Sequence, residues 1–126
     1  MNRKMICTAV MASSLLWLLP APAHAIPAET KAVYQKNCKK CHGWDGKGDT
    51  GEGRKLKLTD LSSATYQKKA TDDKILKTIL EGTVDPQDAK RKMKSYKDAV
   101  GEAQAKELVK VVRAFGKAPG PFPDEK

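Results

Sequence analysis

Aromatic residues, cysteines and histidines are scarce in this chain of 126 residues. Phe, Trp and Tyr together make up 6% of it, with three cysteines and two histidines. A small domain with so few aromatic side chains has a thin hydrophobic core, and small exported domains commonly add disulfides, a metal or a cofactor to such a core. There is also no internal repeat and no uninterrupted apolar run of the ~20 residues that a membrane-spanning helix needs. The sequence therefore predicts one small domain with an additional stabilising element.

The first 25 residues have the layout of a secretory signal peptide. Arg3 and Lys4 precede an apolar run over residues 5–19, and Ala-His-Ala at residues 23–25 forms a small-x-small cleavage site. A retained membrane anchor is the weaker alternative, because the apolar run is short and Pro20 follows it. We therefore predict export to the periplasm and a mature chain that begins after residue 25.

Little remains in the mature chain that could cross-link it or bind a metal. The remaining sulfur and imidazole side chains are Cys38, Cys41, His42 and Met93. Two cysteines that are separated by two residues cannot connect distant parts of a fold, so a disulfide framework is excluded. A bound cofactor is therefore the stabilising element that remains possible for this composition.

Hydrophobic periodicity and capping residues predict an all-α domain over residues 26–118, with three or four short helices and long loops. The expected helices cover residues 27–41, 62–68, 72–81 and 102–115. The glycine-rich residues 45–57 are expected to form a loop without regular structure, and residues 83–97 a polar loop that carries the methionine. No segment predicts a strand. Residues 119–126, rich in proline and charge, are expected to form a flexible tail.

The segment Cys38-Lys39-Lys40-Cys41-His42 is the C-x-x-C-H pattern typical of covalent haem attachment. The two thiols add to the two vinyl groups of a haem, and one turn of helix spaces them to match its edge. The histidine that follows is then held beneath the ring, where its imidazole can ligate iron.

Two other interpretations of the cysteine pair are weaker. A redox-active disulfide usually begins a helix within a βαβ pattern, and that pattern is missing here. A zinc site needs further cysteine or histidine ligands, which the mature chain does not contain. Covalent haem is therefore the favoured interpretation.

From about residue 29 to residue 115 the chain resembles a class I cytochrome c, a small monohaem electron carrier. The haem motif lies near the mature N-terminus, the loop Asp45-Gly46-Lys47-Gly48 follows it, and residues 107–113 (Glu-Leu-Val-Lys-Val-Val-Arg) belong to a C-terminal helix. The resemblance implies the cytochrome c fold, in which the terminal helices cross and the loops wrap around one covalently attached haem c. It also implies one iron per chain.

Met93 resembles the distal methionine ligand of this family, so we expect His42 and Met93 to be the two axial iron ligands. Met93 follows His42 by 51 residues and lies between Lys92 and Lys94, outside any hydrophobic stripe. An ordinary packing role is the alternative, as it is for most methionines. The two lysines are weaker candidate ligands, because their amines are protonated at neutral pH. In the family a proline often follows the ligand methionine, whereas here Lys94 does.

Three residues are candidates to hydrogen-bond the haem propionates: Tyr66, Trp44 and Arg54. Tyr66 is the first choice, since it resembles the family's aromatic residue after the glycine loop. The sequence does not identify the carbonyl that accepts a hydrogen bond from His42, because residues 51–54 (Gly-Glu-Gly-Arg) stand where the family often has Gly-Pro.

The expected function is electron transfer without bond-making catalysis, so we do not expect an enzyme. A sulfur ligand raises the reduction potential of the haem, and two protein ligands leave no open iron position for a substrate. Two alternatives stay open: a haem c subunit of a dehydrogenase or sulfur-compound oxidase complex, and a gas-binding haem protein with an open sixth position.

The positive charge of the chain predicts its partners. After export, 22 basic residues face 15 acidic ones. We name a basic collar beside the two ligand segments, made of Lys36, Lys39, Lys40, Lys90, Arg91, Lys92, Lys94 and Lys97. Such a collar would steer acidic redox proteins, both an electron donor and an oxidase or reductase. We expect a monomer that contacts anionic membrane surfaces only transiently and does not bind nucleic acid.

Overall fold

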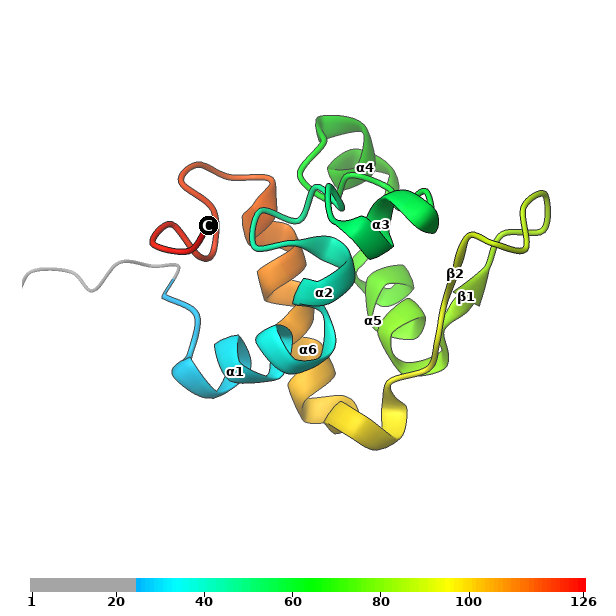
Figure 1. The fold of residues 1–126 in the computed structure, drawn as a ribbon. Helices are drawn as coiled ribbons and strands as arrows, with labels where there is room; N and C mark the ends of the chain where they lie inside the picture. Colours follow the sequence, from blue (N-terminus) through cyan, green and yellow to red (C-terminus); the bar gives the residue numbers. More distant parts are fainter. Residues whose placement is uncertain (1–24) are drawn as a thin grey trace, which may run out of the picture.

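The computed structural model describes residues 25–126. The predicted signal peptide therefore lies outside the described residues, except for Ala25. Helices make up most of the fold (Figure 1). The elements in chain order are α1 (Ala28–Asn37), α2 (Lys39–His42), α3 (Gly51–Lys55), α4 (Ala64–Lys69), α5 (Asp72–Glu81), β1 (Thr83–Val84), β2 (Lys92–Met93) and α6 (Lys97–Phe115). The expected helical fold class is confirmed.

The terminal helices α1 and α6 pack against each other, with α1 at the lower left of Figure 1 and α6 behind α2. Tyr34 of α1 is 2% exposed, and Val111 of α6 is fully buried. Thr30 is buried with them, and its hydroxyl donates a hydrogen bond to the amide oxygen of Gln104, at 3.3 Å. Gly101, with φ of 68°, separates a first turn of α6 from the long helix that follows it. The expected helix over residues 102–115 is therefore confirmed.

Helix α5 forms where its capping residues predict it. The Thr71 hydroxyl accepts a hydrogen bond from the Lys74 amide at 3.2 Å, and Gly82 ends the helix with φ of 77°. Ile75 and Ile79 are buried on one face, and α5 packs against α6. The expected short helix near residues 62–68 also forms, as α4.

Residues 45–57 differ from the expectation of an irregular loop, because they contain α3. Thr50 caps this helix: its hydroxyl accepts a hydrogen bond from the Gly53 amide and donates one to the Cys41 carbonyl, both at 2.9 Å. A Cβ on Gly53 would lie 2.1 Å from the Gly48 carbonyl oxygen. The glycines here let α3 pack directly on the α2 segment, so they serve close packing rather than flexibility.

The expectation that no strand forms is also wrong. β1 and β2 pair as a short antiparallel hairpin, with Thr83 opposite Met93 and Val84 opposite Lys92. Each strand has two residues. That length is too short for an alternating pattern to show in the sequence.

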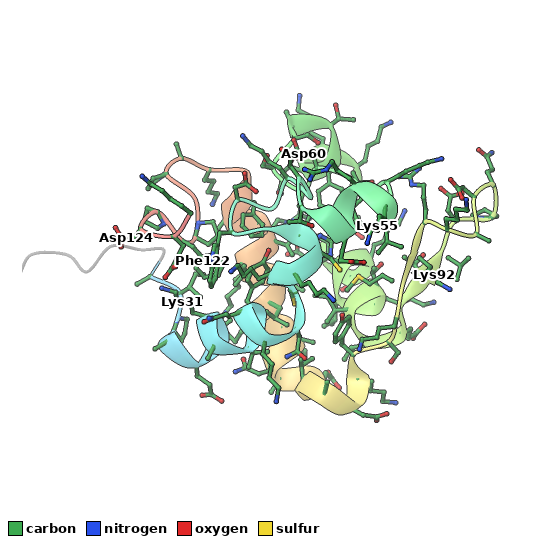
Figure 2. All side chains as sticks on the ribbon, viewed as in Figure 1. Lys31, Lys55, Asp60, Lys92, Phe122 and Asp124 are labelled. Atoms are coloured by element: carbon green, nitrogen blue, oxygen red, sulfur yellow. The ribbon has the colours of Figure 1, made fainter. Side chains whose placement is uncertain are left out.

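The C-terminal segment, expected to be flexible, packs onto the core. Phe122 is 6% exposed, and its ring centroid lies 5.0 Å from that of Tyr34 and 5.1 Å from that of Trp44. Glu125 forms an ion pair with Lys31 of α1. Figure 2 shows Phe122 and Lys31 on one side of the molecule and Lys92 on the opposite side. Burial of one aromatic ring is enough to hold a segment whose composition is otherwise typical of a loop.

Candidate haem site

The C-x-x-C-H segment is a single helical turn between two fixed ends. The His42 amide donates to the Cys38 carbonyl at 2.9 Å, and the Cys41 amide donates to it at 3.1 Å. Gly43 ends the turn with φ of 75°, and the Tyr34 hydroxyl donates to its carbonyl at 2.6 Å. The turn is thus held by the buried α1 residue that also packs against the aromatic rings of the core.

A cavity of about 490 Å³ adjoins this turn. Its lining includes Cys38 and His42 from the motif and Met93 from β2. The apolar part of the wall comes from Leu58, Leu61, Ile75, Ile79, Val84, Leu108 and Val112. Cofactor pockets are usually this large and this apolar. The fold therefore brings the two expected axial ligands and one expected thioether cysteine to the same cavity.

His42 has the protonation state that a metal ligand needs. Burial lowers the pKa of its imidazole below the ordinary value of 6.5, so the ring is neutral at pH 7 and keeps a lone pair for a metal. Its Nδ1 atom is buried without a hydrogen-bond partner among residues 25–126. The carbonyl acceptor expected for this nitrogen is therefore not found in this part of the chain.

The cysteines do not have the properties of the two alternative sites. Burial and the neighbouring Cys41 raise the pKa of the Cys38 thiol to about 12, whereas thiol–disulfide oxidoreductases need a low thiol pKa. Both thiols are free of a disulfide. Within the described part of the chain, no three side chains of His, Cys, Asp or Glu gather into a metal site.

The three expected propionate contacts are placed differently from one another. Tyr66 lines the cavity, so its role stays a prediction that the geometry allows. Trp44 and Arg54 are not among the residues that line this cavity, and a propionate contact for either stays a prediction. Trp44 packs on Tyr34 and Phe122 instead, because the C-terminal segment supplies a ring beside it. Arg54 forms a solvent-exposed ion pair with Asp49 at 2.5 Å.

Five cationic side chains line the cavity: Lys57, Lys69, Lys74, Arg91 and Lys92. Arg91 and Lys92 belong to the basic collar. The sequence did not indicate the other three, because they come from segments distant in sequence from both ligand segments. Arg91 is the most highly connected of the five, with hydrogen bonds to Asp85 and to Thr59.

The donor set fits an iron porphyrin bound through thioethers. A neutral imidazole and a thioether sulfur are haem axial ligands, and the two thiols stand one helical turn apart. Hydrophobic side chains would cover the faces of a macrocycle, and the cationic residues could meet its carboxylates. The chemistry of the cavity therefore agrees with the motif.

Comparisons with known proteins give the same picture. The sequence model of the family described as cytochrome c matches residues 27–114. The solved structure of KustC0563, a c-type cytochrome, is similar with a TM-score of 0.56 and 32% identity, over 70% of this chain and 96% of that one. A tyrosine-to-phenylalanine variant of Kustc0563 gives a TM-score of 0.58 and 34% identity, over 68% and 96% of the two chains. A search of curated proteins found no match.

Proposed function

The chain belongs to the cytochrome c family, and we propose that it is a periplasmic electron carrier that holds one electron on a single haem c. Membership of the family implies a covalently bound haem c with iron. The observation that carries the finer proposal is the single cavity lined by Cys38, His42 and Met93. When bound, the haem supplies reversible one-electron chemistry at its iron.

Different residues of the chain would set the reduction potential of such a haem and shield it from water. The neutral imidazole of His42 and the thioether of Met93 would hold the haem iron, and the soft thioether sulfur would favour its ferrous state. The apolar residues of the cavity lining would exclude water from the faces of the haem. Two fixed ligands leave no position for a substrate, so the proposal includes no bond-making catalysis.

Location and partners form the second half of the proposal. Residues 1–25 have the layout of an export signal, and over residues 25–126 no helix is long and apolar enough to cross a membrane. The basic collar and the cationic residues of the cavity lining favour acidic redox partners. Anionic lipid is a secondary contact of the same surface, and the proposed working form is a monomer without affinity for nucleic acid.

The optical spectrum of the dithionite-reduced, haem-loaded protein tests the ligand set, before and after carbon monoxide is added. The proposal expects a low-spin spectrum that carbon monoxide leaves unchanged, and a Met93→Ala variant that binds the gas readily. A wild-type spectrum that shifts at once with the gas would favour a gas-binding protein with an open sixth position.

The docking surface has a separate test. The rate of electron transfer to an acidic redox protein should fall steeply as salt is added, because screening weakens long-range steering. Lys92→Glu, at an exposed residue of the cavity lining, should reduce the low-salt rate severalfold. Lys110→Glu, the same charge change on α6 outside the cavity lining, is the matched control. Equal effects of the two variants would contradict a localised docking surface. Stable co-purification with a catalytic subunit would instead favour the role of a dedicated haem subunit.

A further inference from the structure

The hairpin that carries Met93 is short, and the hydrogen bonds of its loop, such as that from the Arg91 amide to the Asp88 carbonyl at 2.8 Å, lie within the hairpin itself. Its strands have two residues each, and Val84, opposite Lys92 in the pairing, is 60% exposed. The residue after Met93 is Lys94, so no proline stiffens the chain at this point. Isolated two-stranded hairpins are marginally stable in water. Contacts with the rest of the fold must therefore decide how firmly Met93 is held.

The base of the hairpin is attached to the end of α5. The Tyr96 amide donates to the Ile79 carbonyl at 3.0 Å, and the Ser95 hydroxyl donates to the Leu80 carbonyl at 2.5 Å. Gly82 lies so close that a Cβ on it would be 2.4 Å from the Met93 carbonyl oxygen. These contacts fix the chain on the C-terminal side of Met93.

The other end of the hairpin is attached through the guanidinium group of Arg91. Its Nη1 atom donates to Asp85 Oδ2 at 3.2 Å, across the hairpin. Its Nη2 atom donates to Thr59 Oγ1, also at 3.2 Å, and Thr59 belongs to the segment that follows α3. All three residues line the cavity. A second link runs in parallel, from Lys57 Nζ to Asp88 Oδ2 at 3.0 Å.

We propose that Arg91 is a positioning residue for Met93, because it joins the hairpin to the segment after α3 and so closes the cavity on the methionine side. This inference rests on the proposed axial role of Met93. Arginine suits the position, since its planar fork can donate to two acceptors in different segments at once. Without Arg91 the hairpin keeps its attachment at the base and loses this direct link at the tip. Met93 then leaves the iron more often, and an added ligand can take its place.

Titration of the ferric, haem-loaded protein with imidazole tests the proposal. Imidazole competes with Met93 for the iron, so its apparent affinity reports the fraction of molecules in which the methionine has left. Arg91→Ala should bind imidazole about fivefold to tenfold more tightly than wild type, as expected for the loss of one charged hydrogen-bonding link at a partly exposed site. Arg91→Lys should recover only part of this change. Lys110→Ala, which removes an exposed ion pair with Glu107 on α6 outside the cavity lining, should leave the affinity unchanged.

Thr59→Val keeps the test decisive if Arg91→Ala does not fold. This variant removes the acceptor hydroxyl with little change of shape and should also tighten imidazole binding. Combined with Arg91→Ala, it should add nothing further, because both changes break the same bond. The free energy of unfolding, measured with denaturant, should change far less in these variants than the free energy of imidazole binding. Unchanged imidazole affinity in both single variants, or an equal change in Lys110→Ala, would overturn the positioning role.

Met93→Ala separates the two levels of the proposal. If Met93→Ala binds imidazole no more tightly than wild type, Met93 is not the ligand and the proposed haem coordination fails. If Met93→Ala binds it far more tightly while Arg91→Ala and Thr59→Val behave as wild type, the coordination stands and only the positioning role of Arg91 fails.

Discussion

The side of the cavity that carries His42 and the side that carries Met93 are held in different ways. On the histidine side, the motif turn packs against buried elements, and its terminal carbonyl accepts a hydrogen bond from Tyr34, which is 2% exposed. On the methionine side, a two-residue strand is held at its base by hydrogen bonds from the Tyr96 amide and the Ser95 hydroxyl to carbonyls of α5. Its tip is held by partly exposed side-chain links from Arg91 and Lys57.

This difference separates two kinds of stability. Buried apolar contacts contribute to the free energy of global unfolding, and they break only when the whole domain opens. Exposed polar links contribute little to that free energy, yet they control a local opening with a low free-energy cost. Substitutions on the histidine side should therefore lower global stability, whereas those on the methionine side should change ligand exchange at the iron.

Phe122→Ala should give the largest loss of global stability. Removal of a buried ring costs roughly 3 kcal/mol of unfolding free energy, and here it would leave a gap beside Tyr34, Trp44 and Phe115. Denaturant unfolding measures the loss, and Phe122→Leu should recover most of it. Imidazole affinity should not change, because the ring lies on the side of the molecule away from the hairpin. A loss below about 1 kcal/mol would mean that the C-terminal segment adds little to the core.

Gly82→Ala tests the base of the hairpin on the methionine side. The residue has φ of +77°, and a Cβ would collide with the Met93 carbonyl oxygen at 2.4 Å. We expect a loss of about 2 kcal/mol together with tighter imidazole binding. Gly101→Ala is the control for backbone strain alone, since Gly101 has φ of +68° but no atom within 4 Å of the added Cβ. Equal effects of the two substitutions on imidazole binding would show that the close contact between Gly82 and the Met93 carbonyl does not help to hold Met93 in place.

The sequence predicted the elements whose signals are local. Thr71 and Gly82 mark the ends of α5, and the apolar stripe of the last helix begins after Gly101, as the structure has it. The haem motif could be read directly, because its residue types and spacing are set by the chemistry of attachment. Met93 could be chosen because the mature chain offers no other thioether.

The features that the sequence did not predict depend on contacts between distant segments. Phe122 looked like part of a polar tail because its ring partners come from three other segments. Trp44 packs against Tyr34 and Phe122 and is not among the residues that line the cavity. Arg91 finds Thr59, which is 32 residues earlier in the chain, and no periodic pattern relates the two. Pairing at such separations is a property of the tertiary fold, so local propensity and spacing carry no signal for it.

Tyr34→Phe tests the histidine side through the pH dependence of the unfolding free energy. Burial raises the pKa of Tyr34 far above its ordinary value of 10. Above pH 10 the unfolded chain releases this proton while the folded protein keeps it, so stability falls as pH rises, by up to about 1.4 kcal/mol per pH unit from this residue. The variant should lose ~1.5 kcal/mol at neutral pH, from the hydrogen bond to Gly43, and should then show a shallower alkaline decline. Unfolding measured from pH 8 to 11 checks both effects. An unchanged slope would mean that another group causes the decline.

Thr71→Ala should have the smallest of these effects. Its hydroxyl caps α5 through the Lys74 amide, and the loss of such a cap costs about 1 kcal/mol. The helix belongs to both sides of the comparison, since it packs on α6 and leads into the hairpin at Gly82. Because Thr71 lies at the end of α5 that is distant from Met93, only global stability should fall, and Thr71→Ser should restore it. If imidazole bound more tightly to Thr71→Ala, any weakening of α5 would loosen the methionine, and control of ligand exchange would belong to the whole helix rather than to the contacts of the hairpin.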